Sequence, residues 1–162
     1  MTLSSSLQGR LDAGGRRFAV VAARFNSRLV DLLLGGAVDC LERHGAAPAD
    51  ITVVRVPGAY ELPLALDSLA KTGRFDALVA LGAVVRGETP HFDYVCNECS
   101  KGITSVMSRH GLPVGFGVLT TDTSAQAEER CGGKVGNKGF EAALAAIEMA
   151  DLLAVIGGGD EK

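Results

Sequence analysis

Four short runs rich in apolar or β-branched residues, each followed by a predicted helix, constrain the fold of this chain more than any other feature. The runs are Phe18–Ala23, Ile51–Val56, Ala77–Val85 and 114–119, and the first is apolar at every position. Strands that are buried on both faces have this continuous pattern. When such strands alternate with helices over short loops, they form a parallel sheet with right-handed crossovers and helices on both faces. The sequence therefore predicts an α/β fold.

Helix signals occupy the stretches between the apolar runs. Asn26 or Ser27 is placed to cap a first helix, which Gly45 ends. Pro63 is tolerated only in the first turn of a helix, because its missing N–H has no intrahelical partner there. The helices expected after the first are 60–72, 91–109, 125–131 and 137–155, and a loop is expected over 132–136.

The length of 162 residues and the hydrophobic content of 47% suit one compact domain with a proper core. Ser, Gly and charged residues dominate the first 17 positions, which is typical of a flexible arm. We expect an N-terminal arm over 1–17, a single α/β domain over 18–156 and a tail over 157–162. The chain shows neither an internal repeat nor a linker between domains.

Charge and hydropathy exclude several classes of partner. The net charge is −3, the pI is about 5.6, and Lys and Arg form no basic stripe, which argues against nucleic-acid binding. No apolar run approaches the roughly 20 residues that span a bilayer. The start of the chain lacks the hydrophobic region of a secretory signal, and the four cysteines fit reduced thiols. We therefore expect a cytoplasmic protein that binds neither nucleic acid nor membrane.

Chemically versatile residues follow every predicted strand. They lie at 24–26, 58–61, 86–91 and 120–123. The carboxyl ends of parallel strands share one edge of a sheet, and open α/β sheets bind their ligands at that edge. We therefore expect these four clusters to converge on one site.

The loop 86–91, with the sequence RGETPH, carries the most specific signal. Gly87 permits a close approach of backbone to a ligand, Thr89 supplies a hydroxyl, and the first turn of the next helix presents free N–H groups to an anion. His91 would lie beside such an anion, and histidine is the side chain that exchanges a proton most readily near neutral pH. The competing interpretation is that His91 only caps its own helix and faces solvent.

Several other residues allow more than one interpretation. Phe25 follows a buried strand, where its ring either stacks on a planar heterocycle or joins the core. Arg130, on the short predicted helix, either clamps a phosphate or is solvated. Lys138 lies near a helix start, where the dipole disfavours a cation, so it indicates a negative partner only weakly. His44 and His110 each precede a glycine at a helix C-terminus, which favours a structural role.

The motif Cys96-x-x-Cys99 lies more than a turn inside a predicted helix, whereas a redox pair begins its helix. We interpret both residues as buried core thiols. They do not share a helix face with His91, so the sequence predicts no metal site there. The chain contains neither a phosphate-binding G-x-x-x-x-G-K-S/T loop nor a G-x-G-x-x-G motif after the first strand.

Five segments in order along the chain carry a family resemblance. They are ARFN at 23–26, VPGAYELP at 56–63, LGAVVRGETPHFDYVCNE at 81–98, GFGVLTTDTSAQAEER at 115–130 and KVGNKGFEAALAAIEM at 134–149. Over nearly the whole chain, from Phe18 to about Leu153, their order and spacing resemble the 6,7-dimethyl-8-ribityllumazine synthase family of riboflavin biosynthesis.

The resemblance implies both a fold and a reaction. The fold is a three-layer α/β sandwich whose four-stranded parallel sheet has the flavodoxin-like strand order. The reaction is that of a transferase, which condenses 5-amino-6-(D-ribitylamino)uracil with 3,4-dihydroxy-2-butanone 4-phosphate and releases phosphate and water, the penultimate step of riboflavin biosynthesis. The family uses no metal and no organic cofactor.

The family pattern assigns most of the site to the pyrimidine substrate. Phe25 matches the residue that stacks on the pyrimidine ring, and Lys138 matches a position close to the ring system. The positions that hold the ribityl chain are Ala59, Tyr60 and Glu61, and the positions whose backbone reads the pyrimidine edge are Ala83, Val84 and Val85.

The remaining matches concern the phosphorylated substrate. Glu88 and Thr89 match the loop that receives the butanone phosphate. Arg130 matches the arginine that pairs with that phosphate, and His91 matches the proton-transfer histidine. In the family, Phe116 and Arg130 come from the neighbouring subunit, so the resemblance implies a site that exists only in a homo-oligomer.

The turn around 132–138 is short and has no insertion. In the family this shortness accompanies pentamers that assemble into an icosahedral shell of sixty subunits. The resemblance thus implies a homopentamer, a candidate shell, and riboflavin synthase as a candidate partner. Two alternatives stay open: a flavin- or lumazine-binding carrier, and a shell-forming protein with a vestigial site. Phe25, Glu61, His91 and Arg130 together favour the enzyme, because neither alternative needs all four.

Overall fold

A parallel sheet of four strands forms the centre of the molecule. The structure, a computed structural model, describes residues 5–158 and contains β1 (Phe18–Ala23), β2 (Ile51–Val56), β3 (Ala77–Val85) and β4 (Val114–Thr121). The order across the sheet is β2-β1-β3-β4, and each adjacent pair is parallel. This is the flavodoxin-like order. The predicted fold class is confirmed.

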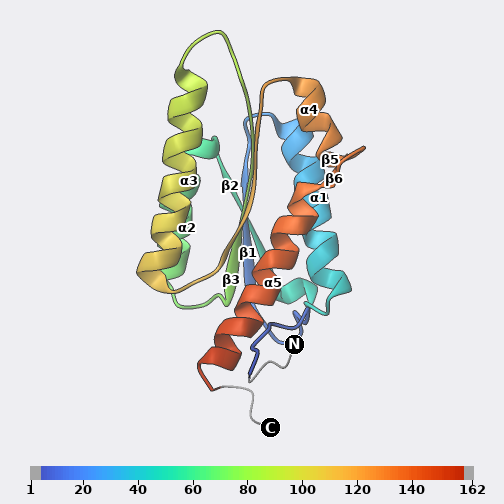
Figure 1. Cartoon of the computed structure of the whole chain (residues 1–162), viewed down its shortest axis with the longest axis vertical. Helices are drawn as coiled ribbons and strands as arrows, with labels where there is room; N and C mark the ends of the chain where they lie inside the picture. The colour runs from blue at the N-terminus through green and yellow to red at the C-terminus, as the bar shows by residue number, and fades with distance from the viewer. Residues whose placement is uncertain (1–4, 159–162) are drawn as a thin grey trace.

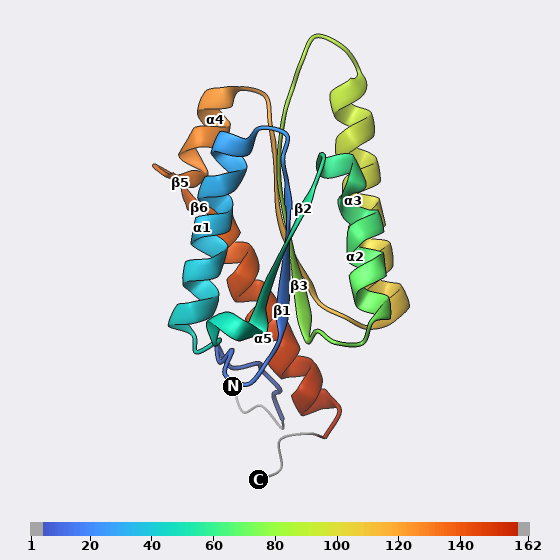
Figure 2. The same cartoon turned by 180° about the vertical axis from the view of Figure 1, so that it is seen from behind.

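Two pairs of helices cover the two faces of the sheet (Figures 1 and 2). The helices α1 (Ser27–Arg43) and α5 (Lys138–Ile156) lie on one face, and α2 (Leu62–Lys71) and α3 (His91–His110) lie on the other. The molecule is therefore a three-layer sandwich. Within the described residues, no helix combines the length and the apolar character needed to cross a membrane.

Strand β1 explains why the sandwich needs apolar residues at every position of a central strand. Its residues alternate between two cores, and each of them is buried. Phe18, Val20 and Ala22 pack in the core beneath α1 and α5. Ala19, Val21 and Ala23 pack in the core beneath α2 and α3. A polar residue at any of these positions would lose its contact with water on either face.

The region after β4 differs from the prediction. The helix α4 (Ser124–Glu129) ends two residues earlier than predicted, and β5 (Cys131–Gly133) and β6 (Gly136–Asn137) form an antiparallel hairpin where a loop was expected. The prediction was wrong because glycines were taken only as loop signals. Gly132, with φ at +103°, and Gly136, with φ at +86°, instead allow the backbone to turn sharply enough to pair with itself.

The bounds of two other elements differ from those predicted from the sequence. A 3₁₀ turn, Ala59–Glu61, precedes α2, so Pro63 is the second residue of that helix and lies in its first turn, as predicted. Strand β4 runs two residues further than predicted, because the long strand β3 offers it pairing partners as far as Val85, opposite Thr121. A further 3₁₀ turn, Pro48–Asp50, leads into β2.

The segment before β1 lies against α5 at the amino end of the sheet (Figure 1). The buried carboxylate of Asp151 accepts a hydrogen bond from the backbone N–H of Arg10 at 2.6 Å and another from the guanidinium of Arg16 at 3.1 Å. Ala13, between them, is fully buried. Residues 1–4 of the predicted arm and residues 159–162 of the predicted tail lie outside the described residues.

Candidate active site

The sheet has its topological switch point between β1 and β3. The chain leaves β1 toward α1 on one face and leaves β3 toward α3 on the other, so the two connections diverge beyond the carboxyl ends of adjacent strands (Figure 1). Open α/β sheets bind ligands in the crevice that such a divergence creates. A pocket of about 800 Å³ lies there, which is a volume typical of sites for small molecules.

Residues from three of the predicted clusters line this pocket. They come from the loop after β1, the loop and 3₁₀ turn after β2, the end of β3, and the loop that leads into α3 together with the start of α3. The predicted site residues among them are Phe25, Ala59, Tyr60, Glu61, Ala83, Val84, Val85, Thr89 and His91. The fourth cluster, 120–123 at the end of β4, does not line the pocket, because β4 lies one strand further from the switch point.

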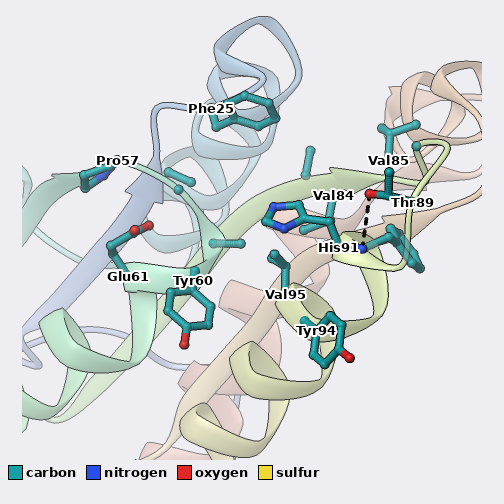
Figure 3. A pocket seen from close by; sticks show the side chains of 16 residues that line it. Phe25, Pro57, Tyr60, Glu61, Val84, Val85, Thr89, His91, Tyr94 and Val95 are labelled. Atoms are coloured by element: carbon teal, nitrogen blue, oxygen red, sulfur yellow. Dashed lines mark hydrogen bonds between the residues drawn. The ribbon is translucent and has the colours of Figure 1, made fainter.

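Phe25 lies at the rim of the pocket, on the loop between β1 and α1 (Figure 3). Two backbone hydrogen bonds hold this loop beside the one that follows β2: Arg24 donates to the carbonyl of Val56 at 2.8 Å, and Phe25 donates to the carbonyl of Pro57 at 3.0 Å. The side chain of Phe25 is 71% exposed. The interpretation of Phe25 as a core aromatic is therefore wrong, and its ring is free to stack on a ligand.

Glu61 is the one acidic side chain on the pocket lining, and within residues 5–158 no lysine or arginine lines it. Glu61 and the exposed ring of Tyr60 come from the 3₁₀ turn after β2. The remaining lining is mostly aliphatic and aromatic, with Thr89 and His91 as the other polar members. A few polar groups in an apolar pocket orient a ligand by its hydrogen bonds. Among the described residues of one chain, a phosphate group in the pocket would therefore find no lysine or arginine to pair with.

His91 is the first residue of α3, and its ring points into the pocket (Figure 3). Its backbone N–H donates to the hydroxyl of Thr89 at 3.4 Å. The ring has no hydrogen-bond or ion-pair partner in the part of the chain that the structure describes. The N-cap of α3 is Pro90, so His91 does not cap its own helix. An exposed ring without a partner is available to exchange a proton with a ligand.

Arg86 holds the loop between β3 and α3 in place. Its Nε donates to Asp122 at 2.8 Å, its Nη1 lies 3.4 Å from Asp93, and its guanidinium stacks over the ring of Phe92 at 4.2 Å. The hydrogen bond to Asp122 raises the pKa of Arg86 above its ordinary value. Sequence reasoning did not predict this role, because Asp122 lies 36 residues away and only the β3–β4 pairing brings it near.

Four predicted site residues are not part of the pocket lining: Glu88, which stands between the lining residues Gly87 and Thr89, and Phe116, Arg130 and Lys138. Phe116 lies on the outer strand β4 and is 48% exposed. The guanidinium of Arg130 donates to the carbonyl of Gln126 at 2.9 Å, and the ammonium of Lys138 pairs with Glu141 at 2.7 Å. One chain therefore does not bring Phe116, Arg130 and Lys138 into the lining of the pocket that holds His91.

Tyr94 and Val95 line the pocket although they were not predicted site residues. They follow His91 by three and four positions on α3, so they share its helix face. That spacing was the signal available in the sequence. Pro57 and Gly58, which directly follow β2, also line the pocket. The other lining residues are Ala23, Gly87 and Phe92.

The cysteines do not form a second reactive centre. Cys99 is buried and Cys96 is half-buried, and both are free thiols. Burial raises the pKa of Cys99 to about 12 and shifts the pKa of Cys96 in the same direction. Thiols of this kind stay protonated at neutral pH and react slowly. Within residues 5–158, no group of three or more His, Cys, Asp or Glu side chains could hold a metal ion.

A parallel α/β sheet with a mainly apolar pocket at its switch point is a small-molecule-binding fold, and His91 gives this pocket a group for proton transfer. A family model described as 6,7-dimethyl-8-ribityllumazine synthase matches residues 15–154. The chain belongs to the 6,7-dimethyl-8-ribityllumazine synthase family.

Curated relatives have the same family name. A 6,7-dimethyl-8-ribityllumazine synthase of Desulfatibacillum aliphaticivorans is 58% identical over 146 residues, which is 90% of this chain and 94% of that protein. A protein of the same name from Desulfovibrio desulfuricans is 56% identical over 153 residues, which is 94% of this chain and 98% of that protein. The similarity thus extends over nearly the full length of both relatives.

Proposed function

We propose that this protein condenses 5-amino-6-(D-ribitylamino)uracil with 3,4-dihydroxy-2-butanone 4-phosphate to form 6,7-dimethyl-8-ribityllumazine, with release of phosphate and water. The observation that carries the proposal is one pocket that joins the exposed ring of Phe25, the carboxylate of Glu61 and the unpartnered ring of His91. The ring of Phe25 suits stacking on a planar heterocycle, and the carboxylate of Glu61 suits hydrogen bonds from a polyhydroxyl chain. The ring of His91 suits proton transfer.

The pyrimidine substrate fits the side of the pocket that β1, β2 and β3 provide. The ring stacks on Phe25, while backbone groups of Ala83–Val85 at the end of β3 bond to its edge. Its ribityl hydroxyls extend toward the turn Ala59–Glu61, where the carboxylate of Glu61 accepts hydrogen bonds. The exposure of Phe25 and the mainly apolar lining support this placement.

The butanone phosphate fits the loop between β3 and α3, where Glu88 and Thr89 lie. The N-terminal end of α3 favours an anion through the helix dipole. His91 begins that turn and so lies between the leaving phosphate and the ring that is being formed. Arg86 keeps the loop in position through its contacts with Asp122 and Asp93.

The reaction needs several proton transfers and a fixed arrangement of two substrates. The amine of the pyrimidine attacks the ketone and forms an imine with loss of water, phosphate then leaves from the β position, and ring closure follows. His91 gives and takes protons in these steps. The walls of the pocket hold the two substrates against each other, which removes much of the entropic barrier.

The site is completed by a second copy of the chain. A phosphate dianion needs a cation, and no lysine or arginine of the described residues lines the pocket. Arg130, Phe116 and Lys138 are accessible on the same chain but lie away from its pocket. We propose a homopentamer in which a neighbour presents Phe116 and Arg130 to each pocket.

The short hairpin of β5 and β6 supports further assembly into a sixty-subunit shell, with riboflavin synthase as a candidate partner.

Mixing the two substrates with the purified protein tests the activity. We expect product absorbance and fluorescence to increase at a rate proportional to protein concentration. Binding of the lumazine without turnover would instead indicate a carrier, and an oligomer that neither binds nor reacts would indicate a structural shell. Light scattering tests the assembly: the mass of a single pentamer would eliminate the shell.

Complementation between variants tests the shared site. His91→Ala and Arg130→Ala chains are co-expressed and compared with each variant alone at limiting butanone phosphate. If His91 and Arg130 of one site come from different chains, random mixing leaves about a quarter of the sites intact and restores activity. Mixed oligomers no more active than the separate variants would contradict the shared site.

A further inference from the structure

Asn26 lies between Phe25 and α1. Its backbone has a positive φ, and its side-chain amide donates a hydrogen bond to the carbonyl of Ala83 at the end of β3. We propose that Asn26 is a positioning residue: it ties the loop that carries Phe25 to the end of β3 and so sets the spacing between the stacking ring and the backbone that reads the edge of a planar heterocycle. This inference rests on the proposed function, because it assigns a role in binding the pyrimidine substrate of that reaction.

The backbone of Asn26 is left-handed. Its φ is 57° and its ψ is 45°, and within residues 5–158 it is the one non-glycine residue with a positive φ. This conformation is unfavourable for residues other than glycine, and asparagine is among the residues that tolerate it best. Strain of this kind persists where the surrounding structure holds the residue and often marks a functional position.

The side chain of Asn26 does not accept a hydrogen bond from the first turn of α1, as an N-cap asparagine usually does. Asn26 is the N-cap of α1, yet its side chain makes no capping hydrogen bond. Asn137, the N-cap of α5, shows the usual arrangement, because its Oδ1 accepts from the backbone N–H groups of Gly139 and Phe140 at 2.9 and 3.1 Å. The amide of Asn26 instead donates to the carbonyl of Ala83 at 2.7 Å.

The carbonyl of Ala83 has lost its strand partner. The pairing of β1 with β3 ends at Ala22 and Leu81, because the chain beyond β1 turns toward the loop after β2. Arg86 donates to Thr121 of β4 at 2.8 Å. Since backbone groups alternate sides along a strand, those of Ala83, three residues earlier, face the β1 side. Asn26 therefore bridges the crevice at the switch point itself.

The bridge joins two walls of the pocket. Phe25 precedes Asn26 directly, and Ala83 begins the lining segment at the end of β3. Because the Phe25 side chain is 71% exposed, core packing does not hold its ring, and the path of the backbone at Asn26 determines where it lies. A planar ring that stacks on Phe25 while its edge bonds to β3 requires the two walls at a fixed separation.

Two substitutions separate the amide from the backbone conformation. Asn26→Gly keeps the left-handed path without strain but removes the amide. Asn26→Asp keeps the size and tolerates the conformation, but it places a carboxylate oxygen against the carbonyl of Ala83. We expect Asn26→Gly to raise the KM for the aminouracil about tenfold, to weaken aminouracil binding in calorimetry by the same factor, and to leave the KM for the butanone phosphate within about twofold.

Asn26→Asp should raise the aminouracil KM further than Asn26→Gly does, because repulsion replaces a hydrogen bond. If Asn26→Gly folds poorly, Asn26→Asp alone still tests the role of the amide. The matched control is Asp151→Ala, which destabilises the opposite end of the molecule and should change neither KM. A wild-type aminouracil KM in both variants, or an equal rise in both KM values, would overturn the positioning role. If the wild type itself forms no lumazine, the proposed function fails instead.

Discussion

The two ends of the central sheet use the same kinds of residue in opposite ways. At the carboxyl end, His91 has no partner for its ring among residues 5–158, and Phe25 is mostly exposed. At the amino end, the ring of His110 donates to Asp67 at 2.7 Å, and His44 donates to the carbonyl of Cys40 at 2.6 Å. The comparison shows that reactive groups are left unsatisfied at the end where the proposed substrates bind.

The carboxylate that lines the pocket differs in the same way from two carboxylates at the amino end. At the amino end, Asp67 binds Lys71 at 2.6 Å and Arg109 at 2.8 Å, and Asp151 is buried against Arg16. Glu61 faces the pocket at the carboxyl end. Removing one partner of a buried pair destabilises a fold, whereas an unpaired charge in a pocket is available to a ligand. Substitutions at the two ends should therefore affect different measurements.

The largest effect is expected from His91→Ala. Removing the proton-transfer group should lower kcat about 100-fold without reducing the rate to the uncatalysed background, because the pocket still positions both substrates. The measurement is steady-state formation of the lumazine by fluorescence. His110→Ala is the control at the amino end, and its kcat should equal that of the wild type. Equal losses in the two variants would remove the distinction between the ends.

Arg130→Ala should have the next largest effect. Loss of a charge-assisted contact with the phosphate should raise the KM for the butanone phosphate about 30-fold and leave the KM for the aminouracil nearly unchanged. Arg109→Ala, which removes an arginine paired with Asp67, is the control. An unchanged KM for the butanone phosphate in Arg130→Ala would refute the phosphate role.

Asp151→Ala should lower stability and leave catalysis intact. Arg10 and Arg16 lose their shared acceptor, which should reduce the free energy of unfolding by about 2 kcal/mol. Denaturant titration measures this loss. Trypsin should also cleave at Arg10 and Arg16 earlier than in the wild type. A variant with wild-type stability and wild-type cleavage would show that this contact does not hold the N-terminal segment.

The smallest effect is expected in the pH dependence of stability near Asp67. Hydrogen bonds from Lys71 and His110 hold the pKa of Asp67 well below its ordinary value. Folding therefore favours the carboxylate, so this contribution is complete above the ordinary carboxyl pKa of about 4 and disappears as pH falls through the lowered value. Asp67→Asn should be less stable than the wild type at pH 7, and the difference should shrink below about pH 4. A difference that is constant with pH would contradict the ion-pair explanation.

Local patterns determined much of this protein. Continuous apolar runs placed the central strands β1 and β3, because a strand that contacts helices on both faces has no position for a polar residue. The more exposed strand β2 was placed by its β-branched residues. Pro63 placed the first turn of α2, because proline lacks the N–H that later turns require. The loop that contains Thr89 and His91 was also recognised from a local pattern, because its residues are consecutive in the sequence.

Tertiary structure decided what consecutive residues cannot specify. The contact of Asn26 with Ala83 and that of Arg86 with Asp122 join residues that are 57 and 36 positions apart, and both depend on which strands are neighbours. The exposure of Phe25 likewise depends on where its loop turns after β1 ends. Sequence periodicity specifies which face of an element is buried, but the strand order specifies which loops meet, because pairing is a contact between distant segments.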